Sequence, residues 1–273
     1  MIPNISNKTL QDLEFTTVLH HIATHCISAL GKERVLEITP IRFKKELFKE
    51  LNLVNEYLSS FESENRVPNH GFDNVTEHIK RLKIENSFIE TEAFLKIAST
   101  SVTVNEHLKF FKKFKMQFPT FFDLSQKIEF TTYIDDEIKK IIELSGEVKN
   151  NASSTLKQIR KDINHVRGKI GASFTSALSS SNNAGFLDDI RETVIDNQRV
   201  LAVKAMYRRK VSGSLLGSSK SGGIVYIAPQ ATLSYSREYQ NLIYEEKQEV
   251  VKILRELATV IRPMTSLLED YIE

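Results

Sequence analysis

The chain has 273 residues, of which 41% are hydrophobic and 26% charged, a composition typical of a soluble globular protein. Its net charge of +2 is too small to indicate a nucleic-acid partner by itself. No apolar run approaches the roughly 20 residues of a membrane span, and MIPNISNKTL lacks the regions of a signal peptide. The single cysteine, Cys26, excludes an intramolecular disulfide, so we expect a cytoplasmic protein.

Residues 1–130 are predicted to form a helical domain, because apolar residues recur there at helical spacing. The first stripe runs from Leu13 to Ala23. A second helix contains PIRFKKELFKELNLVNEYLSSF, with one stripe formed by Leu47, Leu51, Val54 and Leu58. A break is predicted at 66–71, and further helices at 75–82 and 90–112. Few glycines and prolines, 10 and 6 respectively, also favour long helices.

Two stretches, 131–187 and 230–273, predict a pair of long antiparallel helices. The first has a stripe with alternating steps of three and four, formed by Leu156, Ile159, Ile163, Val166 and Ile170. The second has two interleaved apolar series, Ile243, Val250, Leu257, Met264 and Tyr271 with Ile253, Val260 and Leu267. Glu246 is the exception at one of these core positions, and Pro263 predicts a kink or break. We expect helices over about 153–180 and 231–271.

Between these helices, residues 188–229 predict a small β module. Short β-branched segments at 194–195, 200–203 and 224–227 are separated by turn residues, which indicates two to four strands. The predicted fold is therefore mainly α, with a helical N-terminal domain and a coiled-coil-like helix pair that carries a β-rich tip.

The tip contains a glycine-rich segment with a lysine, GSSKSGG at 217–223, which invites comparison with a nucleotide-binding loop. Its spacing does not fit a Walker loop, and it leads into a strand-like segment where that loop requires a helix. No G-x-G-x-x-G motif is present either. We therefore do not expect a nucleotide site in this segment.

The distribution of charge in the tip is more informative, because no acidic residue occurs between Asp196 and Glu238. Lysines and arginines with flexible Gly/Ser backbone suit the sugar-phosphate chain of a nucleic acid. The equal alternative is that these cations are solvated and protect an exposed sheet edge. The candidate DNA- or RNA-backbone-binding residues are Arg199, Lys204, Arg208, Arg209, Lys210, Ser218, Ser219, Lys220 and Ser221.

Other clusters favour structural roles. His21 and His25 have a workable zinc spacing, but no second pair of ligands follows, so no metal site is expected. Adjacent carboxylates such as Asp135 and Asp136 point apart on a helix and cannot converge on one ligand. No arrangement of a nucleophile with a base is detectable, so no catalytic residue is expected.

The tip and its flanks resemble the second bacterial branch of the MutS family of DNA-repair ATPases. The resemblance rests on VLAVKAMYR at 200–208, on GSLLGSS at 213–219 and on YEEKQEVVKILREL at 244–257. It also includes Ser221, Gly222, Tyr226, Ile227 and Pro229, and the opening motifs Leu13-Glu14-Phe15 and Leu30-Gly31-Lys32. The sequence departs from the family pattern at Leu216-Gly217, Ile224 and Ala228, where the family has His-Asp, Thr and Glu. The strand arginine of the family aligns with Gln198, one place before Arg199.

The resemblance implies a core domain at 1–130, lever helices at 131–187 and 230–273, and a DNA-gripping clamp at 188–229. It implies a cytoplasmic homodimer that acts on branched or duplex DNA in repair and suppresses recombination. It also implies that ATP and Mg²⁺ bind an ATPase domain beyond this chain, and that some relatives carry a nuclease domain. We therefore expect an N-terminal fragment without cofactor or enzymatic activity of its own. The alternatives are a ribosome-associated quality-control factor whose clamp binds ribosomal RNA, and a structural spacer that binds no nucleic acid.

Overall fold

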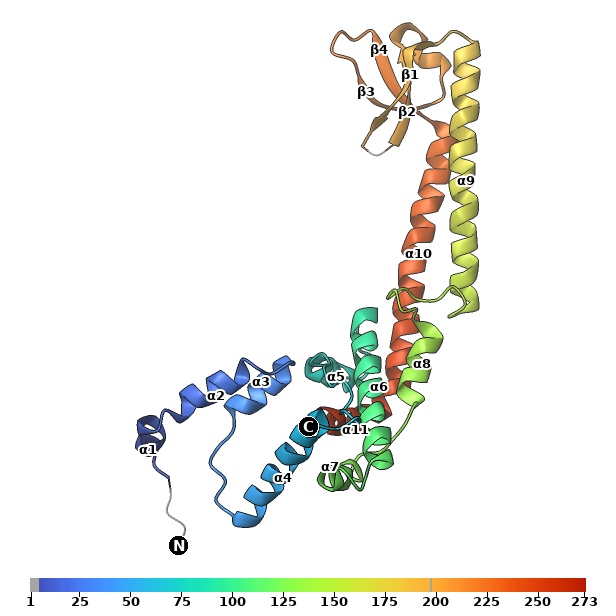
Figure 1. Cartoon of the computed structure of the whole chain (residues 1–273). Helices are drawn as coiled ribbons and strands as arrows, with labels where there is room; N and C mark the ends of the chain where they lie inside the picture. Colours follow the sequence, from blue (N-terminus) through green and yellow to red (C-terminus); the bar gives the residue numbers. More distant parts are fainter. Residues whose placement is uncertain (1–4, 197) are drawn as a thin grey trace. The chain divides into compact units, whose positions relative to one another are not determined.

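A computed structural model describes residues 5–196 and 198–273 and is mainly helical, with one small four-stranded antiparallel sheet (Figure 1). This confirms the predicted fold class in its main features. The chain divides into two compact units, unit 1 with residues 1–149 and 253–273, and unit 2 with residues 150–252. In the described part of the chain, no helix has the length and hydropathy needed to span a membrane.

Unit 1 is built from short and medium helices around α6. Its helices are α1 (Asn7–Asp12), α2 (Phe15–Ala23), α3 (Ala29–Leu36), α4 (Lys44–Phe61), α5 (Thr76–Leu82), α6 (Thr91–Lys113), α7 (Pro119–Ser125), α8 (Tyr133–Ile141), the end of α10 (Gln230–Ile261), the 3-10 turn η2 (Arg262–Met264) and α11 (Thr265–Ile272). Fully buried side chains from α5, α6, α8 and α11 form the core, among them Ile79, Phe94, Ile97, Ile134 and Leu268. Their burial supplies most of the hydrophobic stabilisation of this unit.

Helix α4 contacts the rest of unit 1 through a polar face. The carboxylate of Glu56 is buried and accepts hydrogen bonds from the backbone N–H groups of Thr120, at 2.9 and 3.1 Å, and Phe121, at 3.1 Å. The apolar stripe that the sequence places on this helix is exposed at Leu47, Leu51, Val54 and Leu58. The side of α4 that packs is therefore set by a hydrogen-bonded carboxylate and not by its apolar residues.

Unit 2 contains two antiparallel helices, α9 (Ser154–Asn183) and residues 230–252 of α10. Polar contacts between them include Ser153–Glu249, Arg160–Glu246, Arg167–Tyr239 and Ser173–Thr232. The residue numbers rise along α9 while they fall along α10, which establishes the antiparallel direction. Along α9 the predicted stripe is buried from Leu156 to Val166, whereas Ile170 is half-buried.

The heptad pattern predicted for α10 does not hold along its whole length. Within unit 1, α10 buries Ile253, Leu254, Leu257, Ala258 and Ile261, whereas Val260 is 37% exposed. This is a broad face that packs into a globular core, because neighbouring residues such as 253 and 254 are both buried. The interruption predicted from Pro263 is confirmed: α10 ends at Ile261 and η2 separates it from α11.

The sheet of unit 2 has the strand order β1-β2-β4-β3, and all its neighbouring strands are antiparallel. Its elements are β1 (Leu187–Ile195), β2 (Gln198–Lys204), the 3-10 turn η1 (Ala205–Lys210), β3 (Gly213–Ser218) and β4 (Ile224–Pro229). Figure 1 shows the sheet where α9 ends and α10 begins. Its core joins Phe174 of α9 to strand residues, among them Leu187, Leu201, Val203 and Ile227.

The contacts group the chain differently from the boundaries expected from the sequence. Residues 131–149 and 253–273, which we assigned to the helix pair, lie in unit 1. The physical reason is visible in their buried side chains, since Ile134, Ile138 and Leu268 lie in the core of that unit. Helix α9 agrees with the predicted 153–180, whereas α10 ends at Ile261, before the predicted residue 271.

Candidate nucleic-acid interface

The cationic turn η1 is anchored to the sheet through its apolar residues. Ala205, Tyr207 and Val211 pack against the core cluster of unit 2, and the ring of Tyr207 lies 4.9 Å from that of Phe186. The backbone N–H of Ala205 donates a 2.9 Å hydrogen bond to the carbonyl of Gly223. This anchoring fixes the backbone of η1 on the sheet.

The charged side chains of η1 point away from this anchor into solvent. Arg208, Arg209 and Lys210 are all exposed, and so is Lys204 at the end of β2. Long cationic side chains on a fixed backbone are suited to neutralising phosphates, because only the side chains need to be ordered on binding.

The Gly/Ser turn between β3 and β4 is closed by its own hydrogen bonds. The hydroxyl of Ser219 accepts from the N–H of Ile224 at 3.1 Å and lies 3.3 Å from the hydroxyl of Ser221. The N–H of Gly222 donates to the carbonyl of Ser219 at 2.9 Å, and Gly222 has a positive φ of 72°. The turn is therefore ordered, and it presents Ser218, Lys220 and Ser221 to solvent.

Lys204, the start of η1 and the turn meet at one end of the sheet, and η1 leads from there to Lys210, which lines a pocket with Pro229 and Gln230. Lys204 pairs with Ile224 across β2 and β4, and the next residue, Ala205, hydrogen-bonds Gly223 of the turn. The structure therefore brings Lys204, the start of η1 and the turn at 218–221 together, while Lys210 lies near the opposite end of β4. We call this set of residues the cationic end: Lys204, Arg208, Arg209, Lys210, Ser218, Ser219, Lys220 and Ser221.

Arg199 does not belong to the cationic end. It lies at the start of β2, and a strand rises about 3.3 Å per residue, so its backbone is roughly 16 Å from that of Lys204. Its guanidinium pairs with Glu192 of β1 at 2.6 Å and lies 4.2 Å from the ring centre of Phe174. These contacts give Arg199 a structural role in joining β1 and β2 to α9.

Of the departures from the family pattern, Gly217 and Ala228 fall at packed positions, whereas Leu216 is exposed. A Cβ atom on Gly217 would lie 3.8 Å from side-chain atoms of both Ile195 and Tyr226, so a carboxylate there would meet apolar neighbours. Ala228 is buried beside a cavity of about 240 Å³ whose lining includes Arg199 and Thr232. A glutamate in place of Ala228 would enter this cavity, where Arg199 now pairs with Glu192 instead.

Met206 is a surface residue that the candidate set from the sequence omits. It is 78% exposed within η1, in the same turn as the three consecutive cations. The sequence feature that could have identified Met206 is its place as a large apolar residue inside the cationic run from Lys204 to Lys210.

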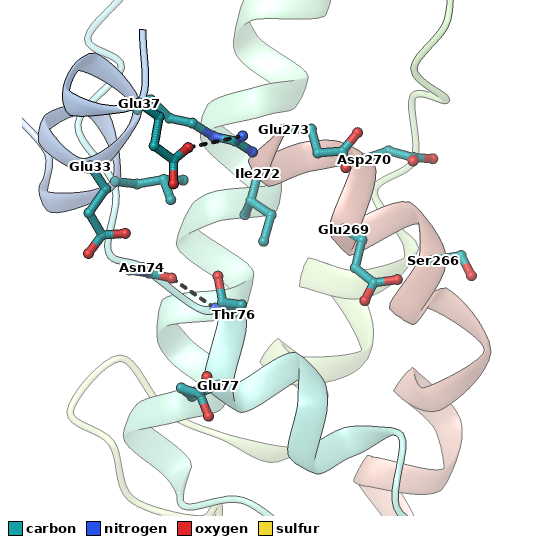
Figure 2. A pocket seen from close by; sticks show the side chains of 12 residues that line it. Glu33, Glu37, Asn74, Thr76, Glu77, Ser266, Glu269, Asp270, Ile272 and Glu273 are labelled. Carbon is teal, nitrogen blue, oxygen red and sulfur yellow. Dashed lines mark hydrogen bonds and ion pairs between the residues drawn. The ribbon is translucent and has the colours of Figure 1, made fainter. Parts of the chain in front are cut away.

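Unit 1 contains a cleft of about 810 Å³ whose lining is mainly acidic, in contrast to the cationic end (Figure 2). Its lining contains Arg34 and six carboxylate side chains, which belong to Glu33, Glu37, Glu77, Glu269, Asp270 and Glu273. Arg34 lies 4.0 Å from Glu37, and Asn74 accepts a hydrogen bond from the N–H of Thr76. This excess of negative charge would repel a phosphate backbone, so the cleft is not a candidate for nucleic-acid binding.

The histidines near the N-terminus form a stacked pair. The rings of His21 and His25 are 5.7 Å apart, and the thiol of Cys26 contacts the carbonyl of Ile22 at 3.8 Å. Across residues 5–196 and 198–273, no group of three or more His, Cys, Asp or Glu side chains is arranged to hold a metal ion.

Comparison with known proteins gives a consistent set of relatives. Endonuclease MutS2 of Alkaliphilus oremlandii is 25% identical over 259 residues, which are 94% of this chain and 33% of that protein. Putative endonuclease MutS2 of Bacillus subtilis is 27% identical over 256 residues, 93% of this chain and 32% of that protein. This chain is similar to MutS2 endonucleases.

A third relative, Endonuclease MutS2 of a Geobacillus species, is 27% identical over 258 residues. These residues are 93% of this chain and 33% of that protein. No family model matches the chain. The chain spans about a third of the length of the MutS2 relatives that it matches.

Proposed function

We propose that the cationic end grips the sugar-phosphate backbone of branched or duplex DNA, in a protein of the MutS-II type that acts in DNA repair and recombination control. The observation that carries this proposal is the exposure of Arg208, Arg209 and Lys210 on a turn whose backbone is held by Tyr207 and Gly223. No acidic residue between Asp196 and Glu238 opposes these charges in sequence.

In this proposal α9 and α10 act as a lever and the sheet as a clamp. The buried stripe of α9 and the cross-helix pair Arg160–Glu246 make the helix pair a defined unit that could transmit movement. In a longer MutS-II-type homodimer, ATP and Mg²⁺ bound to an ATPase domain would drive that movement. This chain itself would contribute binding and no catalysis.

The test compares DNA and ribosome binding of the 273-residue chain over a salt series. Each phosphate contact contributes about 0.9 to the slope of log K against log salt on duplex DNA. We therefore expect the combined substitutions Arg208→Glu, Arg209→Glu and Lys210→Glu to weaken binding and to reduce this slope by up to about 3. The matched control reverses the exposed lysines Lys44, Lys45 and Lys49 of α4, which should leave binding unchanged.

The same experiment separates the alternatives. Tighter binding to ribosomes than to DNA, lost on the same charge reversal, would favour the ribosomal RNA alternative. Equal binding by the charge-reversed and original chains would contradict the assignment of the cationic end and leave the helix pair as a structural spacer.

A further inference from the structure

An exposed methionine projects from the cationic end. Met206 is 78% exposed, more than any other large apolar side chain that the structure describes in unit 2. Its neighbours Ala205 and Tyr207 pack against the core of the sheet, so η1 does not need Met206 for its own anchoring. The side chain thus stands in solvent on a backbone that is fixed by other residues.

The geometry of η1 places this side chain beside a cation. A 3-10 turn has three residues per turn, so side chains at positions i and i+3 lie above one another. Met206 and Arg209 therefore share one face of η1, which runs from Ala205 to Lys210. A backbone phosphate bound by Arg209 would bring the adjoining base step next to Met206.

The chemistry of methionine fits such a position. Proteins that kink DNA insert apolar side chains, methionine among them, between neighbouring bases. The unbranched thioether is flexible and polarisable, so it can fill an irregular gap between bases. The energetic cost of separating two bases is lowest where their stacking is already weakened, as at a branch point.

We propose that Met206 inserts between weakly stacked bases of DNA held by the cationic end, so that the site prefers branched DNA to a straight duplex. This inference rests on the proposed function and names the structural feature of the DNA that the site selects. The cations supply affinity for the backbone, and Met206 supplies the discrimination between the two forms of DNA.

The test uses a four-way DNA junction with 2-aminopurine at the branch and a linear duplex of the same sequence, at low salt. With the original chain we expect 2-aminopurine fluorescence to rise on binding and the junction to bind more tightly. Met206→Ala should remove the fluorescence rise and lower the junction-to-duplex affinity ratio by on the order of tenfold, with an unchanged salt slope. Met206→Leu should retain the ratio, and Met116→Ala, at a 90% exposed methionine of unit 1, is the control.

The outcomes separate the two proposals. If charge reversal abolishes binding but Met206→Ala keeps the fluorescence rise and the junction preference, insertion by Met206 is wrong and backbone binding stands. If the original chain does not bind, or if charge reversal has no effect, both proposals fail. A clear preference for an RNA junction of the same sequence over the DNA junction would overturn the choice of DNA.

Discussion

Arg160 donates a hydrogen bond from its Nε atom to Oε1 of Glu246 across the α9–α10 pair, with an N···O distance of 2.7 Å. The two side chains are 26% and 24% exposed. Glu246 is the residue that interrupts the apolar series of α10, so this ion pair occupies a position where the pattern expects an apolar contact. A partly buried charge needs its counter-ion, and the pair therefore favours one register of the two helices.

We predict that Glu246→Ala destabilises unit 2 by about 1–3 kcal/mol, because Arg160 loses its ionic partner in a partly buried setting. The double substitution Arg160→Met with Glu246→Leu should recover most of that loss. Hydrogen exchange of α9 amides measures the effect within unit 2. Glu245→Ala, at the exposed neighbouring position, is the control, and equal protection in the two single variants would contradict the prediction.

A second prediction concerns Gly213 at the start of β3. A Cβ atom there would lie 2.1 Å from the carbonyl oxygen of Ala228, which no real side chain tolerates. Gly213→Ala should therefore separate β3 from β4 and destabilise the sheet by on the order of 2–3 kcal/mol.

The control for this prediction is Gly168→Ala. Gly168 is an exposed residue in the middle of α9, and an added Cβ meets nothing within 4 Å. This substitution should stabilise α9 by about 0.5–1 kcal/mol, since alanine loses less backbone entropy than glycine in a helix. Thermal unfolding should thus move in opposite directions for the two variants, and a shift in the same direction would count against the geometry at Gly213.

The sequence predicted features that depend on local pattern. The α9 stripe from Leu156 to Val166 is buried, and the helix break lies where Pro263 requires it, because both follow from spacing and backbone geometry alone. The β-branched segments of β2 and β4 were also predicted from the sequence as strands. Local pattern was sufficient wherever a single element determines its own buried face.

The rest depends on contacts between distant residues. The exposed stripe of α4 at Leu51 and Val54 could not be foreseen, because the packed face is chosen by hydrogen bonds that α7 backbone N–H groups donate to Glu56. For the candidate site, the cations of the run from Lys204 to Lys210 are exposed, and their part in nucleic-acid binding stays a prediction. The separation of Arg199 from it depends on Glu192 and Phe174, which no local pattern links to Arg199.

Glu56 provides a third prediction, since α7 has no side-chain cap of its own and its N-terminal N–H groups donate hydrogen bonds to this carboxylate. Glu56→Ala should destabilise unit 1 by about 1–3 kcal/mol, because it leaves the N–H groups of the half-buried Thr120 and Phe121 without this acceptor. Glu50→Ala on the exposed side of the same helix should change stability by no more than about 0.5 kcal/mol. Urea unfolding of both variants tests this difference, and equal midpoints would argue against the capping role.

The last prediction separates Arg199 from the cationic end. Arg199 is paired with Glu192 and lies over the ring of Phe174, whereas Arg208 is exposed on η1. The substitutions Arg199→Ala and Arg208→Ala each remove one positive charge. A site that responds only to net charge would therefore lose the same DNA affinity from either substitution. If the geometry decides, Arg208→Ala should lower DNA affinity severalfold and reduce the salt slope by about 0.9, since one phosphate contact is lost.

Arg199→Ala should instead leave the DNA salt slope unchanged and lower the stability of unit 2 by up to about 1 kcal/mol, because its ion pair and cation–π contact are partly exposed. DNA titrations over a salt series, together with hydrogen exchange of β1 and β2 amides, measure the two effects on the same protein samples. Equal losses of affinity from both variants would contradict the separation of Arg199 from the cationic end. If only Arg208→Ala weakens binding, the surface that holds the DNA backbone is defined by the position of its cations on the sheet and not by their number.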